Sequence, residues 1–82
     1  MKWTKELHFH KVWSENNTFV SDNDIISYTL EQAHYYNLTI KEIELYDSIA
    51  CTIKLRGTKK LYLNFVRDFV KHYKNHITNV SF

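Results

Sequence analysis

The chain has 82 residues, of which 44% are hydrophobic and 24% are charged, and its formal net charge is +2. A chain of this length can build one core but not two, so we expect one compact domain over residues 1–82. The balance of 11 Lys and Arg against 9 Asp and Glu excludes a protein that binds nucleic acid mainly by non-specific neutralisation of phosphate charge.

The sequence contains no long apolar run that could span a membrane, and the residues after Met1 lack the apolar stretch of a signal peptide. We therefore expect a cytoplasmic protein that does not bind membranes, and the single cysteine, Cys51, agrees with a reducing compartment. Lys outnumbers Arg nine to two and Pro is absent. This bias is typical of an AT-rich coding genome and suggests a low-GC bacterium or a phage.

A first β-strand is predicted from Glu6 to Trp13, because apolar and polar residues alternate there with the period of a strand. The inward parity is assigned to Trp3, Leu7, Phe9 and Trp13. His8 and His10 then project from the opposite, outward face. The polar stretch that follows, from Ser14 to Phe19, is expected to form a surface loop.

A first helix is predicted from Asp22 to Tyr36 or Asn37. Ser21 can accept a hydrogen bond from a free backbone N–H at the start of this helix. Asn37 is suited to end it in a left-handed conformation. The inward stripe is assigned by helical spacing to Ile26, Leu30, Ala33 and Asn37, with Ile25 and Tyr36 beside it. Tyr35 is expected to face water.

The clearest signal in the chain is a β-hairpin from Thr39 to Arg56, in which a polar break separates two alternating runs. Because one face of the hairpin must be apolar throughout, a slip of one residue between the arms is excluded. The predicted cross-strand pairs are Leu45–Cys51, Ile43–Ile53 and Glu42–Lys54. The connection between the arms is predicted to be Asp47-Ser48-Ile49. The core face then consists of Ile43, Leu45, Cys51, Ile53 and Leu55.

A second helix is predicted to follow the cap residue Thr58 and to run to about Asn75. Its inward stripe consists of Tyr62, Phe65, Val66, Phe69 and Tyr73, which recur at helical spacing. An alternative interpretation makes Leu61–Phe65 a further strand after a Gly-Thr turn, followed by a shorter helix. The residues from Ile77 to Phe82 are predicted to form the last strand.

The predicted order is strand, helix, strand, strand, helix, strand. With right-handed crossovers, this order gives an α+β ferredoxin-like βαββαβ fold, a four-stranded antiparallel sheet with two helices on one face. The first and third strands are then central, and the other two strands form the edges. Proteins of this fold include enzymes, RNA readers, metal carriers and interaction domains, so the fold by itself does not indicate a function.

No combination of residues in the sequence indicates catalysis, a metal site or a cofactor. His8 and His10 share a strand face, and His72 and His76 are expected to share one side of a helix, but two imidazoles do not complete a zinc site. Cys51 is on the inward parity, where burial raises the pKa of a thiol. A chain with one glycine cannot contain a P-loop or a dinucleotide fingerprint. We therefore expect a protein that is not an enzyme.

We expect a protein-binding module instead. The aromatic content of 16% exceeds what a small core can bury, and Tyr and Trp dominate interface energetics. The residues assigned to partner binding are His8, His10, Glu42, Glu44, Tyr46, Lys54, Arg56 and Tyr35. The edge strands offer a second route, because each could pair with another chain, including a second copy in a homodimer. The small size and the coding bias suggest a phage or mobile-element inhibitor of a host defence protein.

The alternative is a nucleic-acid-binding domain that uses the open face of the same sheet. In RNA-recognition modules of this topology, the central strands present aromatic side chains that stack on bases. The outward residues here are His8, His10 and Val12 on the first strand and Thr52, Lys54 and Arg56 on the third. Aromatic stacking residues are therefore missing from these positions. A set of four basic residues could still bind phosphates: Lys54, Arg56, Lys59 and Lys60.

Overall fold

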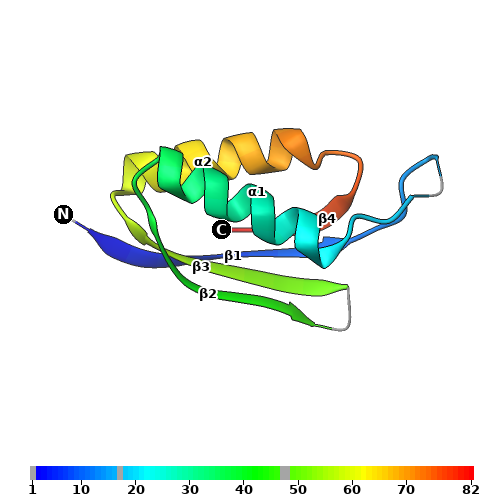
Figure 1. Ribbon diagram of the computed structural model, residues 1–82, viewed down its shortest axis with the longest axis horizontal. Helices are drawn as coiled ribbons and strands as arrows, with labels where there is room; N and C mark the ends of the chain where they lie inside the picture. The colour runs from blue at the N-terminus through cyan, green and yellow to red at the C-terminus, as the bar shows by residue number, and fades with distance from the viewer. Residues whose placement is uncertain (1, 17, 47–48) are drawn as a thin grey trace.

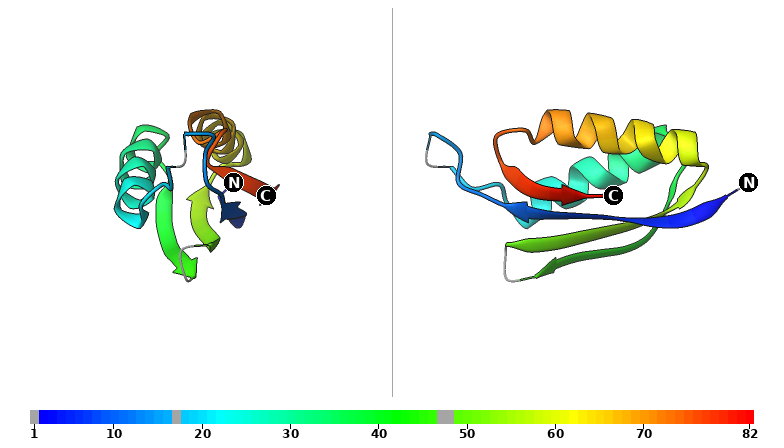
Figure 2. Two further views of the ribbon diagram at one scale, coloured as in Figure 1. Left: turned by 90° about the vertical axis from the view of Figure 1, so that its right-hand side faces the viewer. Right: turned by 180° about the vertical axis from the view of Figure 1, so that it is seen from behind.

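The computed structural model describes residues 2–16, 18–46 and 49–82, and it confirms the predicted α+β ferredoxin-like fold. The elements are β1 (Trp3–Lys11), α1 (Asp22–Tyr35), β2 (Thr39–Tyr46), β3 (Ala50–Gly57), α2 (Lys59–His72) and β4 (Ile77–Ser81). Both helices lie on one side of the sheet, and the other side is uncovered in the described part of the chain (Figure 1; Figure 2). The molecule is therefore a two-layer structure with one open sheet face.

The strands are antiparallel and lie in the order β2-β3-β1-β4, so β3 and β1 are central and β2 and β4 form the edges, as predicted. The hairpin register is also confirmed. The observed partners include Glu42–Lys54, Ile43–Ile53 and Leu45–Cys51. The predicted connection Asp47-Ser48-Ile49 contains two residues, 47 and 48, that lie outside the described part of the chain.

A β-bulge in β2, which the sequence prediction did not include, shifts the register between Ile40 and Glu42. Ile40 pairs with Leu55, whereas Ile43 pairs with Ile53, so one extra residue of β2 lies between these pairs. The bulge lets Ile40 and Ile43, which are three residues apart, both pack against the core. In a regular strand, residues three apart point to opposite faces. This odd spacing of two isoleucines is visible in the sequence and is the signal that would have predicted the bulge.

The core lies between the helices and the sheet, and α2 supplies its aromatic side. The predicted stripe is confirmed, because Tyr62, Phe65, Val66, Phe69 and Tyr73 are all buried. Phe69 packs against Phe9 of β1 with ring centroids 5.1 Å apart. The helix starts at the predicted cap, where the Thr58 side chain accepts a hydrogen bond from Leu61 N at 3.4 Å. The alternative strand at Leu61–Phe65 is excluded, since these residues are helical.

The inward stripe predicted for α1 is confirmed at Ala33 and wrong at Leu30. Ile25, Thr29 and Ala33 are buried, whereas Leu30 is 55% exposed. The prediction favoured Leu30 because it is more apolar than Thr29, but the four-residue spacing from Ile25 to Ala33 directs Thr29 into the core. The predicted start is confirmed, because Ser21 accepts from Asp24 N at 3.1 Å. The helix ends at Tyr35, before the predicted Tyr36 or Asn37, and Asn37 has the predicted left-handed conformation with a φ of 57°.

The predicted range of β1, Glu6–Trp13, is also corrected to Trp3–Lys11. Trp13 lies beyond the strand, 63% exposed, with its ring 5.1 Å from that of Phe19. The inward position near the end of β1 is occupied by Lys11, whose buried ammonium forms an ion pair with Asp22 and lies 3.4 Å from Val20 O. This ion pair ties the end of β1 to the first turn of α1.

Two further ends differ from the prediction. The helix α2 ends at His72 rather than near Asn75, and β4 ends at Ser81 rather than Phe82. The end of β4 is shaped by a register shift against β1, next to Asn79, which has a φ of 54°. Such a bulge lets Ile77 and Val80 both reach the covered side of the sheet, where they pack with the core.

Gly57, the last residue of β3, is required by a close approach to Leu38. A β-carbon placed on this glycine would lie 2.3 Å from the Cδ2 atom of Leu38, a separation that side-chain atoms cannot adopt. Because Leu38 is itself buried in the core, there is little room for it to move. The single glycine of the chain is therefore explained by packing between β3 and the residue that leads from α1 into β2.

Candidate protein-binding surface

The open face of the sheet brings together six of the eight residues that the sequence assigned to partner binding. Cross-strand partners place them side by side in the order of the strands. One row is Glu42–Lys54–Glu6 and the next is Glu44–Thr52–His8. His10 lies beyond His8 on β1, and Arg56 lies beyond Lys54 on β3, between Thr39 and Thr4. We call this set, Glu6, His8, His10, Glu42, Glu44, Thr52, Lys54 and Arg56, the open sheet face.

Three carboxyl groups lie on the open sheet face, together with two permanent cations, Lys54 and Arg56. Glu6 and Glu42 flank Lys54 on both sides, and Glu44 is a neighbour of Glu42 on the same strand face. The pKa of Glu44 is raised by a hydrogen bond with the Glu42 carboxyl group, by desolvation and by repulsion from Glu42 and Glu6, while Lys54 opposes the shift. The Glu44 carboxyl group therefore responds to both neighbouring carboxyl groups, and Lys54 only partly offsets their effect.

The two strand histidines are held by neighbouring polar groups. A hydrogen bond of 2.9 Å joins His8 Nδ1 to Thr52 Oγ1, and His8 Nε2 lies 3.4 Å from Glu6 Oε1. Asn79 Nδ2 donates to His10 Nδ1 at 3.1 Å. Among the described residues, no three His, Cys, Asp or Glu side chains converge as a metal site would require. Both imidazoles are thus hydrogen-bonded to neighbouring side chains and remain exposed on the sheet.

The two tyrosines assigned to the same surface differ in what the structure describes. Tyr35 is the last residue of α1 and is 74% exposed, so it lies in the helical layer and not on the open sheet face, and its ring packs edge-on against Tyr36 at 4.9 Å. Tyr46 ends β2, where its backbone pairs with Ala50, but its side chain lies outside the described part of the structure. The described side chains of the open sheet face are therefore charged and polar.

The basic residues considered for phosphate binding are split between two places. Lys54 lies between two carboxylates on the sheet, whereas Lys59 and Lys60 are exposed in the first turn of α2. Arg56 is exposed near the end of β3. Phosphate binding gains from cations that are not already close to carboxylates. The position of Lys54 therefore disfavours it as a phosphate contact.

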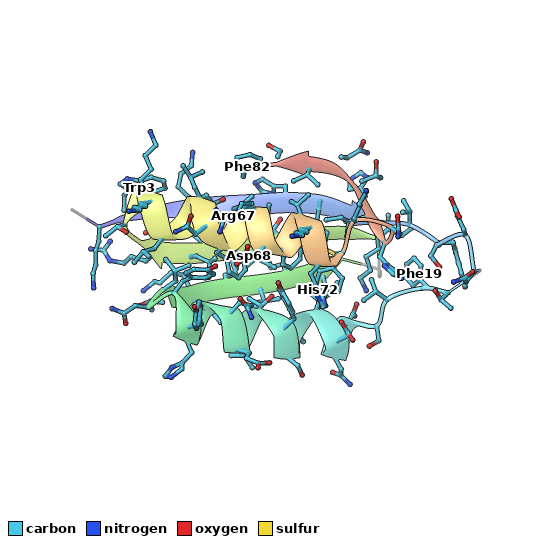
Figure 3. All side chains as sticks on the ribbon, turned by 90° about the horizontal axis from the view of Figure 1, so that it is seen from above. Trp3, Phe19, Arg67, Asp68, His72 and Phe82 are labelled. Atoms are coloured by element: carbon cyan, nitrogen blue, oxygen red, sulfur yellow. The ribbon has the colours of Figure 1, made fainter. Side chains whose placement is uncertain are left out.

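A polar and aromatic contact between the helices, which we call the seam, was not predicted from the sequence. The hydroxyl group of Tyr36, the residue after α1, donates to the Asp68 carboxylate of α2, and that of Tyr28 on α1 donates to Asp68 O at 3.2 Å. The Tyr28 ring also stacks on His72, with centroids 4.2 Å apart and planes 18° from parallel. Figure 3 shows Asp68 and His72 on the side of α2 that faces α1. The eight-residue spacing of Tyr28 and Tyr36 is the signal that could have indicated this contact.

The hydrogen bonds of this seam change the acidity of its members. The bond from Tyr36 is the main cause that lowers the pKa of Asp68, and Arg67 adds to it, with its Nε atom 3.4 Å from Asp68 Oδ1. The same bond raises the pKa of Tyr36. Both shifts favour a neutral phenol that donates to an ionised carboxylate. The seam is a structural contact between helices at neutral pH.

The expected pairing of His72 and His76 on one helix side is wrong, because α2 ends at His72. Both histidines line a shallow groove of about 400 Å³ at the end of α2, together with Asp24 and Tyr73. The hydroxyl group of Tyr73 donates to Asp24 Oδ1 at 2.6 Å. His72 is already stacked on Tyr28. Tyr73, Asp24 and His72 are thus already engaged in contacts within the protein.

Cys51 lies on the covered side of the sheet, as predicted. Its side chain is buried, and burial raises the pKa of its thiol to about 11. The thiol is therefore protonated and shielded at neutral pH. Such a group packs as a small apolar side chain and is not suited to act as a nucleophile.

Comparisons of the chain with protein-family models, with curated proteins and with solved structures found no match. Within the described residues, neither helix is long and apolar enough to cross a membrane.

Proposed function

We propose that the chain is a non-enzymatic module that binds another protein through the open sheet face. The observation that carries this proposal is the row Glu42–Lys54–Glu6 with Glu44 beside it, an alternating charge pattern on three adjacent strands. Because strands hold these side chains at fixed spacings, a partner with the complementary pattern can be selected by charge. The imidazoles of His8 and His10 add hydrogen-bonding groups to the same surface.

We further propose a cytoplasmic inhibitor from a phage or mobile element, directed against a host defence protein. The support for this more specific proposal is the small size of the domain, the coding bias of the sequence and the absence of catalytic motifs from it. A small domain with a charged, rigid face can block a larger protein without chemistry of its own. The buried, reduced Cys51 agrees with a reducing compartment.

Binding of nucleic acid through the same face is less well supported. Three carboxyl groups lie beside Lys54, and each would repel a phosphate that approached this lysine. The open sheet face also lacks aromatic side chains at the described central positions on which bases would stack. Protein binding is therefore the function that the charge pattern favours.

The test is a pull-down from the lysate of a low-GC bacterium with the domain as bait. The variant Glu42→Lys/Glu44→Lys reverses two charges of the open sheet face, and Glu31→Lys reverses one exposed charge on α1 as the control. We expect the wild type and the control to recover the same partner in stoichiometric amounts. The sheet variant should lose it, because like charges across an interface are strongly unfavourable.

A pull-down without a stoichiometric partner, combined with salt-dependent binding of RNA or DNA that Lys54→Glu/Arg56→Glu abolishes, would replace this proposal by the nucleic-acid alternative. Recovery of the same partner by the sheet variant would show that another surface is used. Circular dichroism of all variants checks that each remains folded.

A further inference from the structure

A second surface differs from the open sheet face in chemistry and in position. It is a groove of about 470 Å³ between α2 and the end of β4. The lining residues are Leu63, Val66, Arg67, Val70, Lys71, Lys74 and Phe82, which we call the α2–β4 groove. Figure 3 shows Phe82 at the end of β4, on the side of α2 away from α1. The groove is thus separate from both the open sheet face and the seam between the helices.

The floor of the groove is apolar. Leu63, Val66 and Val70 repeat at three- and four-residue spacing along one side of α2. Val66 is buried at the base, while Leu63 is 39% exposed and Phe82 is 57% exposed. This apolar stripe continues the core stripe of α2 outward. An apolar occupant would therefore remove these side chains from water and extend the packing of the core.

The rim of the groove is basic. Arg67 and Lys71 lie four residues apart on α2, Lys74 lies just beyond the end of this helix, and the lining contains no acidic residue. Among the ion pairs of the described residues, only Arg67 of these three takes part in one, with Asp68. The groove therefore combines an apolar floor with a positive rim. An occupant that matches both must carry apolar side chains and a negative charge.

A second copy of this chain does not match the groove. In a symmetric dimer through this face, each groove would meet its own copy. The rim residues Arg67, Lys71 and Lys74 would then lie near the same three cations of the other molecule, which is electrostatically unfavourable. A membrane surface does not match it either, because the floor is recessed between a helix and a strand, whereas membrane-binding helices present their apolar face outward.

The edge of the sheet next to the groove suits an extended partner segment. β4 is an edge strand, and its residues Ile77–Ser81 include no charged side chain. A segment that pairs with this edge would direct alternate side chains toward the helices, where the groove lies. From Leu63 to Lys71 the helical rise corresponds to roughly 12 Å. This length matches about four residues of extended chain.

We propose that the α2–β4 groove is a docking site for a short acidic protein segment that carries apolar side chains. The apolar residues occupy the floor formed by α2 and Phe82, and the carboxylates lie against Lys71 and Lys74. This inference goes beyond the proposed function, because it concerns a different surface and a different class of contact. It does not depend on whether the open sheet face binds a partner.

The test is selection of peptides from a random library of about 12 residues on the immobilised intact domain. Selected peptides are then synthesised, and their binding is measured by fluorescence anisotropy. We expect the enriched sequences to combine Asp or Glu with at least two apolar residues. Leu63→Ser/Phe82→Ser should weaken their binding by about tenfold or more, since both exposed apolar anchors are lost. Lys71→Glu/Lys74→Glu should weaken it by a similar factor.

Each variant has a matched control outside the groove. Leu30→Ser removes an exposed leucine from α1, and Lys59→Glu/Lys60→Glu reverses two exposed charges at the start of α2. Both controls should bind the selected peptides as the wild type does. Glu42→Lys/Glu44→Lys should also bind normally, which separates this test from that of the open sheet face.

Three outcomes would overturn the proposal. The first is a selection that enriches no acidic, apolar peptide, or enriches peptides that the groove variants still bind. The second is a dimer in analytical ultracentrifugation that Leu63→Ser/Phe82→Ser dissociates, since the occupant would then be a second copy. The third is binding to phosphatidylglycerol vesicles that depends on the same residues, since the occupant would then be a lipid surface.

Discussion

The two faces of the sheet differ in burial and in charge. On the covered face, Leu7, Phe9 and Ile53 are almost fully buried beneath the helices. On the open face, their immediate neighbours in sequence, His8, His10 and Lys54, contact water. Strand geometry alone produces this difference, because successive side chains point to opposite faces. One short chain thereby builds a core and a charged surface from the same strands.

The two faces also accommodate charged side chains in different ways. The covered face accepts the ammonium of Lys11 only with the Asp22 carboxylate beside it, because an unpaired buried charge is costly. The open face holds three carboxyl groups close together, and water reduces their repulsion. Changes on the covered face should therefore alter folding stability. Changes on the open face should alter binding and titration and leave stability nearly unchanged.

The most direct test compares two neighbouring residues of β1. Leu7→Ala should lower the free energy of unfolding by about 3 kcal/mol, because it leaves a cavity at a fully buried site. His8→Ala removes an exposed side chain and should change it by less than about 0.5 kcal/mol. Urea denaturation followed by circular dichroism measures both. Equal losses in the two variants would contradict the division between the faces.

The Lys11–Asp22 ion pair allows a sharper comparison, since its two members are buried to different extents. The side chain of Lys11 is 1% exposed and that of Asp22 is 42% exposed. Asp22→Ala leaves the buried ammonium without its carboxylate and should cost about 2 kcal/mol, less than for a fully buried pair. Lys11→Met leaves a carboxylate that water can reach and should change the stability by less than about 1 kcal/mol.

Denaturant unfolding of both single variants and of the double variant measures this asymmetry. The double variant should be more stable than Asp22→Ala alone, because it no longer contains an unpaired buried charge. If Lys11→Met costs as much as Asp22→Ala, the ion pair does not act through the burial of the lysine.

The features predicted correctly from the sequence depend on repeated patterns. The hairpin register followed from two alternating runs, and the α2 stripe followed from five large apolar residues at helical spacing. In both cases many residues agree, so an error in one position would conflict with the others. The same patterns placed the charged residues of the open sheet face, since a residue next to an inward one must point outward.

The errors occur where a polar residue is buried or an apolar one is exposed. Hydrophobicity assigned Leu30 to the core of α1, but the packed helix buries Thr29 instead. Lys11 was not recognised as an inward residue. Its burial depends on Asp22, which belongs to α1 and not to the strand. The α2–β4 groove was also missed, since it forms only when β4 lies beside α2. Such features depend on tertiary contacts that the pattern of one element does not contain.

The smallest expected effect concerns the titration of the open face. Since the pKa of Glu44 is raised above its usual value of 4.5, mainly by its hydrogen bond with Glu42, the folded protein binds this proton more tightly than the unfolded chain does. The contribution of Glu44 to stability is therefore fully present below pH 4.5 and is lost as the pH rises through its raised pKa. Glu42→Ala should return the Glu44 pKa toward 4.5 and flatten this part of the pH profile. NMR titration of the side-chain carboxyl carbons measures the shift, with Glu31→Ala on α1 as the control. An unchanged Glu44 pKa in Glu42→Ala would show that these two carboxyl groups titrate independently. It would contradict the coupling between carboxyl groups that distinguishes the open face from the covered face.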